Sequence, residues 1–218
     1  MKTIIAAIVL CVTLIGGGIY LALKPSKPQP RQIPLASVYV QHLKDGYWER
    51  GATNPKVIVT EYADFQCPAC YRFEPTLAAA ISQTSDIAQL QFKHYPIIKL
   101  HDKAQLAALA SESAGRQGKF WEMHDVIYKA QPQWEPENIT TFRNILETYA
   151  KQLNLNIDQF NADIDASNTG DLITTNMQQG DADKLQGTPD ILINGKPIEG
   201  IPQTVDDLVK LIRQAAGA

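Results

Sequence analysis

The apolar and polar positions predict two buried strands with a helix between them in the first half of the chain. Residues 55–62 form a largely apolar, β-branched run, which is typical of a strand inside a sheet. A short loop follows, and the spacing of apolar residues predicts a helix that begins at Cys67 and continues, kinked, past Pro75. Residues 87–95 predict the second strand.

A helical pattern replaces the strand pattern from His101 to about Ala166 and predicts four inserted helices. The first is expected to have Asp102 as its N-cap and to end near Gly118. The positions that mark the other three are Phe120, Met123, His124 and Ile127, then Ile139, Phe142, Ile145, Leu146, Tyr149 and Leu153, and finally Ile157, Phe160 and Ile164.

The last part of the chain returns to strands. Residues 190–193 predict a strand, Asn194 and Gly195 a tight turn, and residues 196–199 its antiparallel partner. Residues 205–215 predict a closing amphipathic helix. The whole order therefore predicts an α/β domain whose central sheet is covered on both faces.

An apolar run at the N-terminus predicts a membrane anchor. Lys2 and Lys24 bracket residues 3–23, which carry no charged side chain and are long enough to cross a bilayer of roughly 30 Å. The alternative is a cleaved secretory signal, but its apolar region should span only about 7–15 residues and end in small residues. An uncleaved anchor, residues 1–24, is the preferred interpretation.

A proline-rich segment, residues 25–35, follows the anchor and predicts an extended, semi-rigid linker. The remaining residues, 36–218, are enough for one folded domain, with its helical insert at about 101–166. The basic side chains in residues 24–31 outnumber Lys2, and charge counting alone would place this domain on the cytoplasmic side.

Charge and cysteine content narrow the function classes. The chain has 20 basic and 23 acidic residues, and without Lys2 and Lys24 the rest carries a net charge of about −5. Because it has no basic cluster, nucleic-acid binding is not expected. Cys11 lies in the predicted anchor, so Cys67 and Cys70 can pair only with each other inside the domain.

The sequence Cys67-Pro68-Ala69-Cys70 predicts a reactive disulfide pair. Cysteines three apart in a first helical turn can bring their sulfur atoms to bonding distance, and the positive end of a helix stabilises a thiolate. Pro68 suits the first helical position, where no N–H donor is needed. We therefore expect Cys67 to be the low-pKa attacking sulfur and Cys70 the buried resolving one, with Pro68 and Ala69 as the active-site loop.

The competing interpretation is that these two cysteines supply half of the ligands of a zinc site. A structural zinc ion needs a second pair of ligands, and the domain has no further cysteine, while His94 and His101 are seven residues apart. We expect neither metal nor small-molecule cofactor, although a zinc ion bridging two copies stays open. His94, His101 and His124 are expected to pack or cap rather than to catalyse.

Glu61 lies six residues before Cys67 in an otherwise apolar strand. If buried beneath the cysteines, it would have a raised pKa and could accept the proton of Cys70. The alternative is an exposed strand carboxylate, and the residues alone leave both open.

Five short motifs together carry a resemblance to a known family. They are Thr-Glu-Tyr-Ala-Asp-Phe-Gln-Cys-Pro-Ala-Cys at 60–70, Phe-Lys-His-Tyr-Pro at 92–96, Gln-Gly-Lys-Phe-Trp-Glu-Met-His at 117–124, Gly-Thr-Pro at 187–189, and Ile-Asn-Gly-Lys at 193–196. Over roughly residues 55–215 the chain resembles the membrane-anchored DsbA-like thiol:disulfide oxidoreductases. The resemblance implies a thioredoxin fold with a helical insertion.

The resemblance also implies roles for individual residues. Cys67 would be the nucleophile, Glu61 the buried proton-relay carboxylate, and Thr188 would precede a cis Pro189 packed against the cysteines. The residues alone would favour a trans Pro189, because few X-Pro bonds are cis in folded proteins. The backbone at Thr188 and Pro189 is expected to pair with an extended substrate.

The implied activity is disulfide-bond formation in unfolded or reduced extracytoplasmic proteins, with a membrane redox partner that reoxidises the cysteine pair. The expected location is the cell membrane, with residues 3–23 in the bilayer and the domain on the extracytoplasmic side. A reductase or isomerase on the same fold is the first alternative, and a non-catalytic metal or binding module is the second.

Two features of the sequence depart from the family pattern. Pro68-Ala69 lacks the histidine found between the cysteines of the most oxidising relatives, so one source of thiolate stabilisation is missing. Asp190 directly follows Pro189, and if its carboxylate approached Cys67 it would raise the thiol pKa and make the disulfide less oxidising.

Overall fold

The computed structural model describes residues 43–44 and 46–217. The predicted anchor and linker, residues 1–35, lie outside the described residues, and so does the assignment of residues 3–23 to the bilayer. Within the described part of the chain, none of the helices combines the length and the apolar character that crossing a membrane requires.

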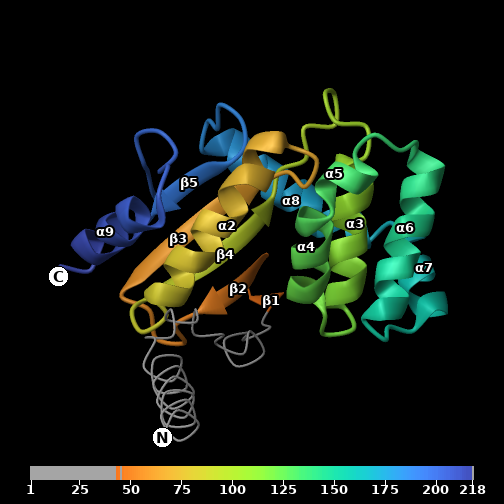
Figure 1. The fold of residues 1–218 in the computed structure, drawn as a ribbon, viewed down its shortest axis with the longest axis horizontal. Helices are drawn as coiled ribbons and strands as arrows, with labels where there is room; N and C mark the ends of the chain where they lie inside the picture. The colour runs from red at the N-terminus through yellow and green to blue at the C-terminus, as the bar shows by residue number, and fades with distance from the viewer. Residues whose placement is uncertain (1–42, 45, 218) are drawn as a thin grey trace, which may run out of the picture. The chain divides into compact units, whose positions relative to one another are not determined.

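The described strands form one six-stranded sheet in the order β1-β2-β4-β3-β5-β6 (Figure 1). The central strands β3 and β4 run parallel, and the other neighbours pair antiparallel. The bounds are β1 Leu43–Lys44, β2 Tyr47–Gly51, β3 Val57–Ala63, β4 Ala88–His94, β5 Asp190–Ile193 and β6 Lys196–Pro197.

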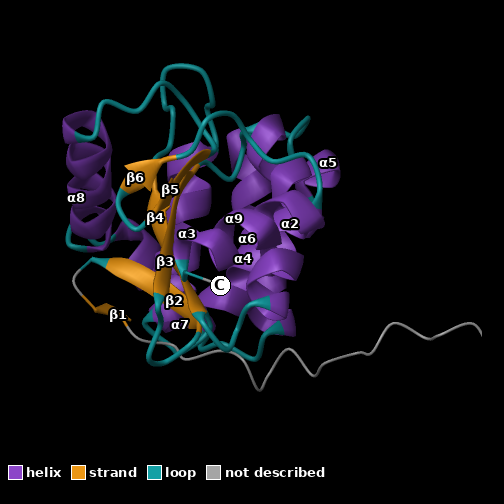
Figure 2. Cartoon of the chain, turned by 90° about the vertical axis from the view of Figure 1, so that its left-hand side faces the viewer, coloured by secondary structure: helices purple, strands orange, loops and turns teal. Residues whose placement is uncertain are grey.

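Helices cover both faces of this sheet, as the sequence predicts. Figure 2 shows α8 on one side of the strands and α2 with α9 on the other, while the block from α3 to α7 lies beside the sheet in Figure 1. The bounds are α2 Pro68–Gln83, α3 Ala104–Gly115, α4 Phe120–Lys129, α5 Gln131–Trp134, α6 Ile139–Gln152, α7 Ile157–Asp165, α8 Thr169–Ala182 and α9 Val205–Ala215. The α/β thioredoxin fold with a helical insertion is therefore confirmed.

Two details of the predicted helical insert are wrong. Lys103, not Asp102, occupies the N-cap position of α3, and the Asp102 carboxylate instead accepts hydrogen bonds from Gln66 and Lys103. The insert also continues beyond Ala166, because α8 adds a further helix whose polar sequence gives little helical periodicity. The second strand of the final hairpin is shorter than expected, since β6 ends at Pro197.

Aromatic packing joins the insert to the sheet. Phe92 of β4 contacts Phe120 and Trp121 of α4 with ring centroids 5.6 and 6.2 Å apart. His124 is fully buried, and its ring lies 4.9 Å from that of Phe92. His94 is also buried, with its Nε2 atom 2.7 Å from a Glu112 carboxylate oxygen. The two buried histidines are therefore packing residues, as expected.

Candidate active site

The cysteine pair lies at the start of α2, directly after the loop that leaves β3. Cys67 occupies the N-cap position, Pro68 opens the helix, and Cys70 lies in the first turn. Cys67 is 7% exposed, whereas Cys70 is fully buried, and both are free thiols. An incoming sulfur can therefore reach Cys67, while Cys70 is shielded, which is the order of accessibility expected from the sequence.

The loop before Cys67 is held by polar contacts. Asp64 accepts hydrogen bonds from the backbone N–H groups of Gln66 and Ile97, and His101 Nδ1 lies 2.7 Å from the same carboxylate. Gln131 of α5 donates from its amide to the Cys67 carbonyl at 3.2 Å. The predicted structural role of His101 agrees with this geometry, since it orients the loop and does not contact the sulfur atoms.

The surroundings separate the two thiol pKa values. A hydrogen bond from the Cys70 thiol makes the largest contribution to lowering the pKa of Cys67 to about 5. Burial opposes this shift, while the Thr188 side chain and the backbone N–H groups of Cys70 and Ala69 assist it. Burial, followed by the hydrogen bond to Cys67, raises the pKa of Cys70 well above its usual value. At neutral pH Cys67 is therefore a thiolate and Cys70 a neutral donor.

Glu61 is buried beneath this pair. Its strand β3 lies between β4 and β5, where it pairs with Phe92 and Ile191, and its side chain is fully buried. Burial and then the charge of Glu74 raise the pKa of Glu61 well above its usual value, while Arg50 acts in the opposite direction. The Glu61 charge also contributes to the raised pKa of Cys70. The exposed alternative is therefore wrong.

Two charged residues near Glu61 were missed by sequence reasoning. Arg50 of β2 forms an ion pair with Glu74 at 2.7 Å and a longer one with Asp125 at 3.4 Å. Glu74 lies four residues after Cys70, so helical spacing could have placed it below the site. Arg50 gave no such signal, because its strand was not predicted.

A group of possible metal ligands adjoins this ion pair. Glu74, His124 and Asp125 have ligand atoms within 4.8 Å of one another. Arg50 already provides a cation to both carboxylates, so the group does not require a metal ion to balance its charge.

Thr188 and Pro189 face the reactive sulfur from another element. The peptide bond between them is cis, and Cys67 Sγ lies 3.3 Å from the Thr188 carbonyl oxygen. Asp190 follows, and its charge acts together with that of Asp183 to raise the pKa of the Tyr62 hydroxyl group.

The insertion of helices between β4 and β5, together with a thiol pair at the start of α2, defines the class: DsbA-like thiol–disulfide oxidoreductases with a thioredoxin fold. The chain belongs to the thioredoxin family, and a family model described as thioredoxin matches residues 44–214.

Solved structures share this fold at low sequence identity. Oxidised BdbD from Bacillus subtilis is 23% identical and superposes with a TM-score of 0.67 over 83% of this chain and 98% of that one. Alpha-DsbA1 from Wolbachia pipientis is 18% identical, with a TM-score of 0.67 over 82% and 94% of the two chains. MdbA from Corynebacterium diphtheriae, a thiol-disulfide oxidoreductase, is 15% identical, with a TM-score of 0.64 over 80% and 92%.

Curated relatives of higher identity are much longer proteins. The Na(+)/H(+) antiporter NhaA 3 from Salinispora tropica is 31% identical over 166 residues, which is 76% of this chain and 24% of the relative. The Na(+)/H(+) antiporter NhaA 1 from Salinispora arenicola is 32% identical over 151 residues, or 69% and 22%. The chain spans about a quarter of the length of these relatives, and ion exchange is the described activity of those proteins.

Proposed function

We propose that this protein oxidises dithiols in unfolded or reduced substrate proteins through the Cys67–Cys70 disulfide. The observation that carries the proposal is the lowered pKa of Cys67, about 5. A stabilised thiolate favours the reduced form of the pair, so the corresponding disulfide is a stronger oxidant than one formed by ordinary thiols.

The steps of the reaction follow from the roles proposed for Cys67, Cys70 and Glu61. A substrate thiolate attacks Sγ of Cys67 in the disulfide, the bond to Cys70 breaks, and Cys70 leaves as a thiolate that takes a proton from Glu61. A second substrate thiolate then attacks the substrate sulfur of the mixed disulfide. Cys67 leaves as a stable thiolate, and the substrate departs with a new disulfide. The substrate loses two electrons, and the cysteine pair gains them.

The direction of reaction is tested by a redox titration of the purified protein against glutathione. We expect a reduction potential on the oxidising side of about −200 mV, because strong oxidants of this fold lie near −120 mV and thioredoxin near −270 mV. A value near −270 mV would favour the reductase or isomerase alternative. Stoichiometric zinc with no thiol exchange would favour the binding module.

The same titration has a defined pH dependence. Above the Cys67 pKa of about 5, reduction adds two electrons and one proton, since Cys67 stays a thiolate while Cys70 is protonated. The potential should then fall by about 30 mV for each pH unit, and below that pKa by about 59 mV. A slope that stays near 59 mV up to pH 8 would contradict the thiolate at Cys67.

We further propose that residues 3–23 anchor the protein in the membrane, with the domain on the extracytoplasmic side, where a membrane redox partner reoxidises the cysteines. The uncharged run of residues 3–23 and the oxidising chemistry support this location. In intact cells a membrane-impermeant maleimide should label Cys67 after mild reduction. Labelling that requires cell lysis would place the domain inside.

A further inference from the structure

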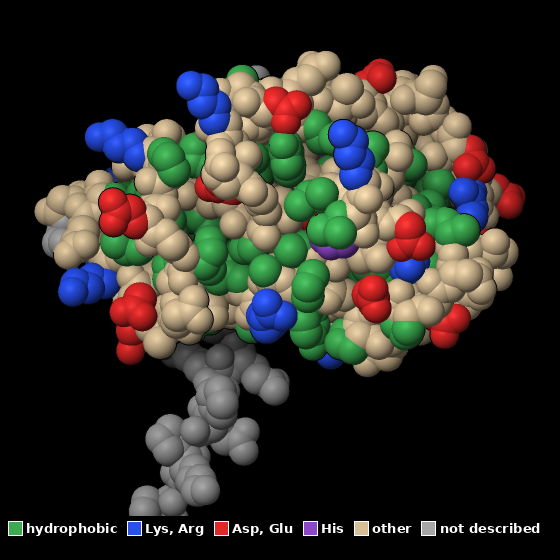
Figure 3. Space-filling view, turned by 90° about the horizontal axis from the view of Figure 1, so that it is seen from above, with side chains coloured by type: hydrophobic (Ala, Val, Ile, Leu, Met, Phe, Trp, Pro, Cys, Tyr) green, Lys and Arg blue, Asp and Glu red, His purple; other side chains and the backbone are tan. Residues whose placement is uncertain are grey.

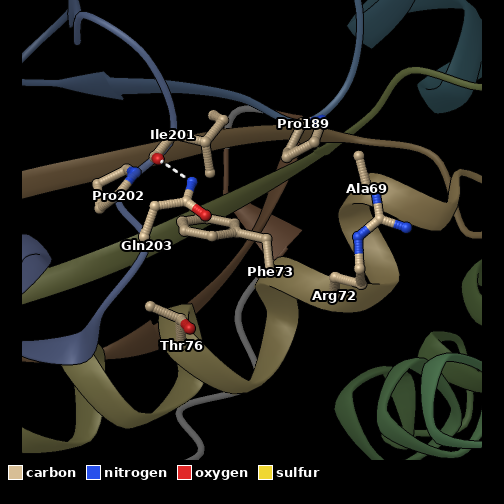
Figure 4. Close-up of a pocket in the computed structure, with 8 residues that line it drawn as sticks. All are labelled: Ala69, Arg72, Phe73, Thr76, Pro189, Ile201, Pro202 and Gln203. Carbon is tan, nitrogen blue, oxygen red and sulfur yellow. Dashed lines mark hydrogen bonds between the residues drawn. The ribbon is translucent and has the colours of Figure 1, made fainter.

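A groove of about 200 Å³ lies beside the active-site loop, with Ala69 and Pro189 in its lining (Figure 4). At one side Ala69 lies between the two cysteines, and at the other Pro189 follows Thr188, whose carbonyl oxygen is 3.3 Å from Cys67 Sγ. The groove is lined by Ala69, Arg72, Phe73, Thr76, Pro189 and the segment 201–203. The lining therefore includes the immediate sequence neighbours of Cys70 and of Thr188.

The walls of the groove are largely apolar. Phe73 and Ile201 point into it in Figure 4, with Pro189 and Pro202 beside them. The Gln203 amide donates to the Ile201 carbonyl at 2.7 Å, so this donor is already used within the protein. Figure 3 looks onto the end of the domain where α2 begins, and hydrophobic side chains gather in the middle of that face with charged ones around them.

Arg72 is the ionisable residue in this lining. Its side chain is exposed, and among the described residues it has no hydrogen bond or ion pair. In Figure 4 it extends along the Ala69 end of the groove, which is the end next to the cysteines. A cation without a partner beside an apolar surface is complementary to an apolar segment that carries one carboxylate.

The charge of the whole chain acts in the opposite direction. The formal net charge is −3, so long-range electrostatics favour cationic over acidic peptides. A preference for an acidic residue would therefore have to come from a local contact in the groove, and Arg72 is the residue placed to make it.

We infer that Arg72 is a specificity-determining residue, which selects substrate segments with an acidic side chain within a few residues of the reacting cysteine. The inference rests on the proposed function, because it concerns the substrates of the same site. An exposed ion pair of this kind corresponds to a rate preference of roughly two- to fivefold at low ionic strength, and salt weakens it.

The test uses three apolar peptides, each with two cysteines. They differ only at one position next to the first cysteine, where one peptide has Glu, one has Gln and one has Lys. The full-length protein, solubilised and oxidised at Cys67–Cys70, reacts with each peptide, and the second-order rate constant is measured. Each value is divided by the rate of the same peptide with bis(2-hydroxyethyl) disulfide, since the added charge also changes the peptide thiol. We expect Glu above Gln above Lys by about two- to fivefold, with the preference lost in 0.5 M salt.

Variants assign this preference to Arg72. Arg72→Gln should remove it, Arg72→Glu should reverse it, and Arg72→Lys should retain most of it. Lys56→Glu is the matched control, because it makes the same change of charge as Arg72→Glu. Lys56 is exposed and precedes β3, at the end of that strand opposite to Cys67. The control variant should keep the wild-type order of the peptides.

The outcomes separate this inference from the proposed function. If the Gln peptide is oxidised but the wild-type protein shows no order among the three peptides, or if Arg72→Gln keeps the order, the role of Arg72 is wrong and the oxidase function stands. If none of the peptides is oxidised, the proposed function fails, and the inference fails with it.

Discussion

Replacing Cys67 by serine will abolish thiol–disulfide exchange, whereas replacing Cys70 by serine will turn the protein into a trap for mixed disulfides. Cys67 holds the accessible sulfur and the pKa of about 5, so no other thiol of the domain can replace it as the attacked atom. In Cys70→Ser the Cys67 thiolate can still attack a disulfide of an oxidised substrate, which is the reverse of the proposed reaction, and one substrate sulfur leaves as a thiolate. The mixed disulfide that forms then lacks the internal Cys70 thiol that would release it. Non-reducing gels and mass spectrometry of the adducts measure both effects.

The control for these variants is Cys11→Ser, which removes the third cysteine of the chain and should leave exchange unchanged. Adducts recovered equally through Cys67 and Cys70, or none from Cys70→Ser, would contradict the assigned roles.

A second substitution of Cys70 tests the low pKa of Cys67. Because the hydrogen bond from Cys70 makes the largest contribution to the low pKa of Cys67, Cys70→Ala should raise the pH at which Cys67 alkylation is half-maximal.

The parts of the fold that were predictable have strong local signals. The strands at residues 57–63 and 88–94 agree within two residues with the predicted runs, and α9 begins and ends where its amphipathic pattern does. The strand β2 was missed because its sequence, Tyr-Trp-Glu-Arg-Gly, has neither strict alternation nor a β-branched run. The helix α8 was missed because Thr, Asn, Gln and Asp dominate it, and its position is fixed by packing on the sheet rather than by its own periodicity.

The site shows the same division between local and long-range information. The order of the two cysteines follows from the start of a single helix, so the sequence was sufficient. The burial of Glu61 does not follow, since both faces of β3 are covered and a central strand gives no period that separates them. Arg50 reaches Glu74 only because β2 pairs with β4, a contact between distant parts of the chain. Such residues could be placed only by the fold.

Glu61→Gln should slow the exchange reaction at pH 7 by at least about tenfold. General acid–base groups contribute typically 10²–10⁴ in rate, and Glu61 is the buried carboxyl group whose charge acts on the Cys70 thiol. The glutamine keeps the shape of the side chain but carries no exchangeable acidic proton. The measurement is the rate of peptide oxidation by stopped-flow fluorescence from pH 5 to 9. An unchanged rate profile would mean that Cys70 exchanges its proton with water and not with Glu61.

The same substitution should stabilise the reduced protein, with an effect that grows with pH. Glu61 has a folded-state pKa raised well above its ordinary value of 4.5. Above pH 4.5 the unfolded state can therefore release the proton while the folded state keeps it. The free energy of unfolding of the wild type should fall, relative to Glu61→Gln, by about 1.4 kcal/mol for each pH unit across this window, until the folded carboxyl also ionises.

Urea unfolding of the reduced proteins between pH 4 and pH 8 measures this difference, and the other titrating groups cancel because both proteins share them. The exposed Glu135 provides the control, since Glu135→Gln makes the same chemical change at a side chain that is not buried. A constant difference between wild type and Glu61→Gln would show that Glu61 ionises alike in the folded and unfolded states. In that case Glu61 could not act as the proton donor to Cys70, and the exchange mechanism would need a different proton path.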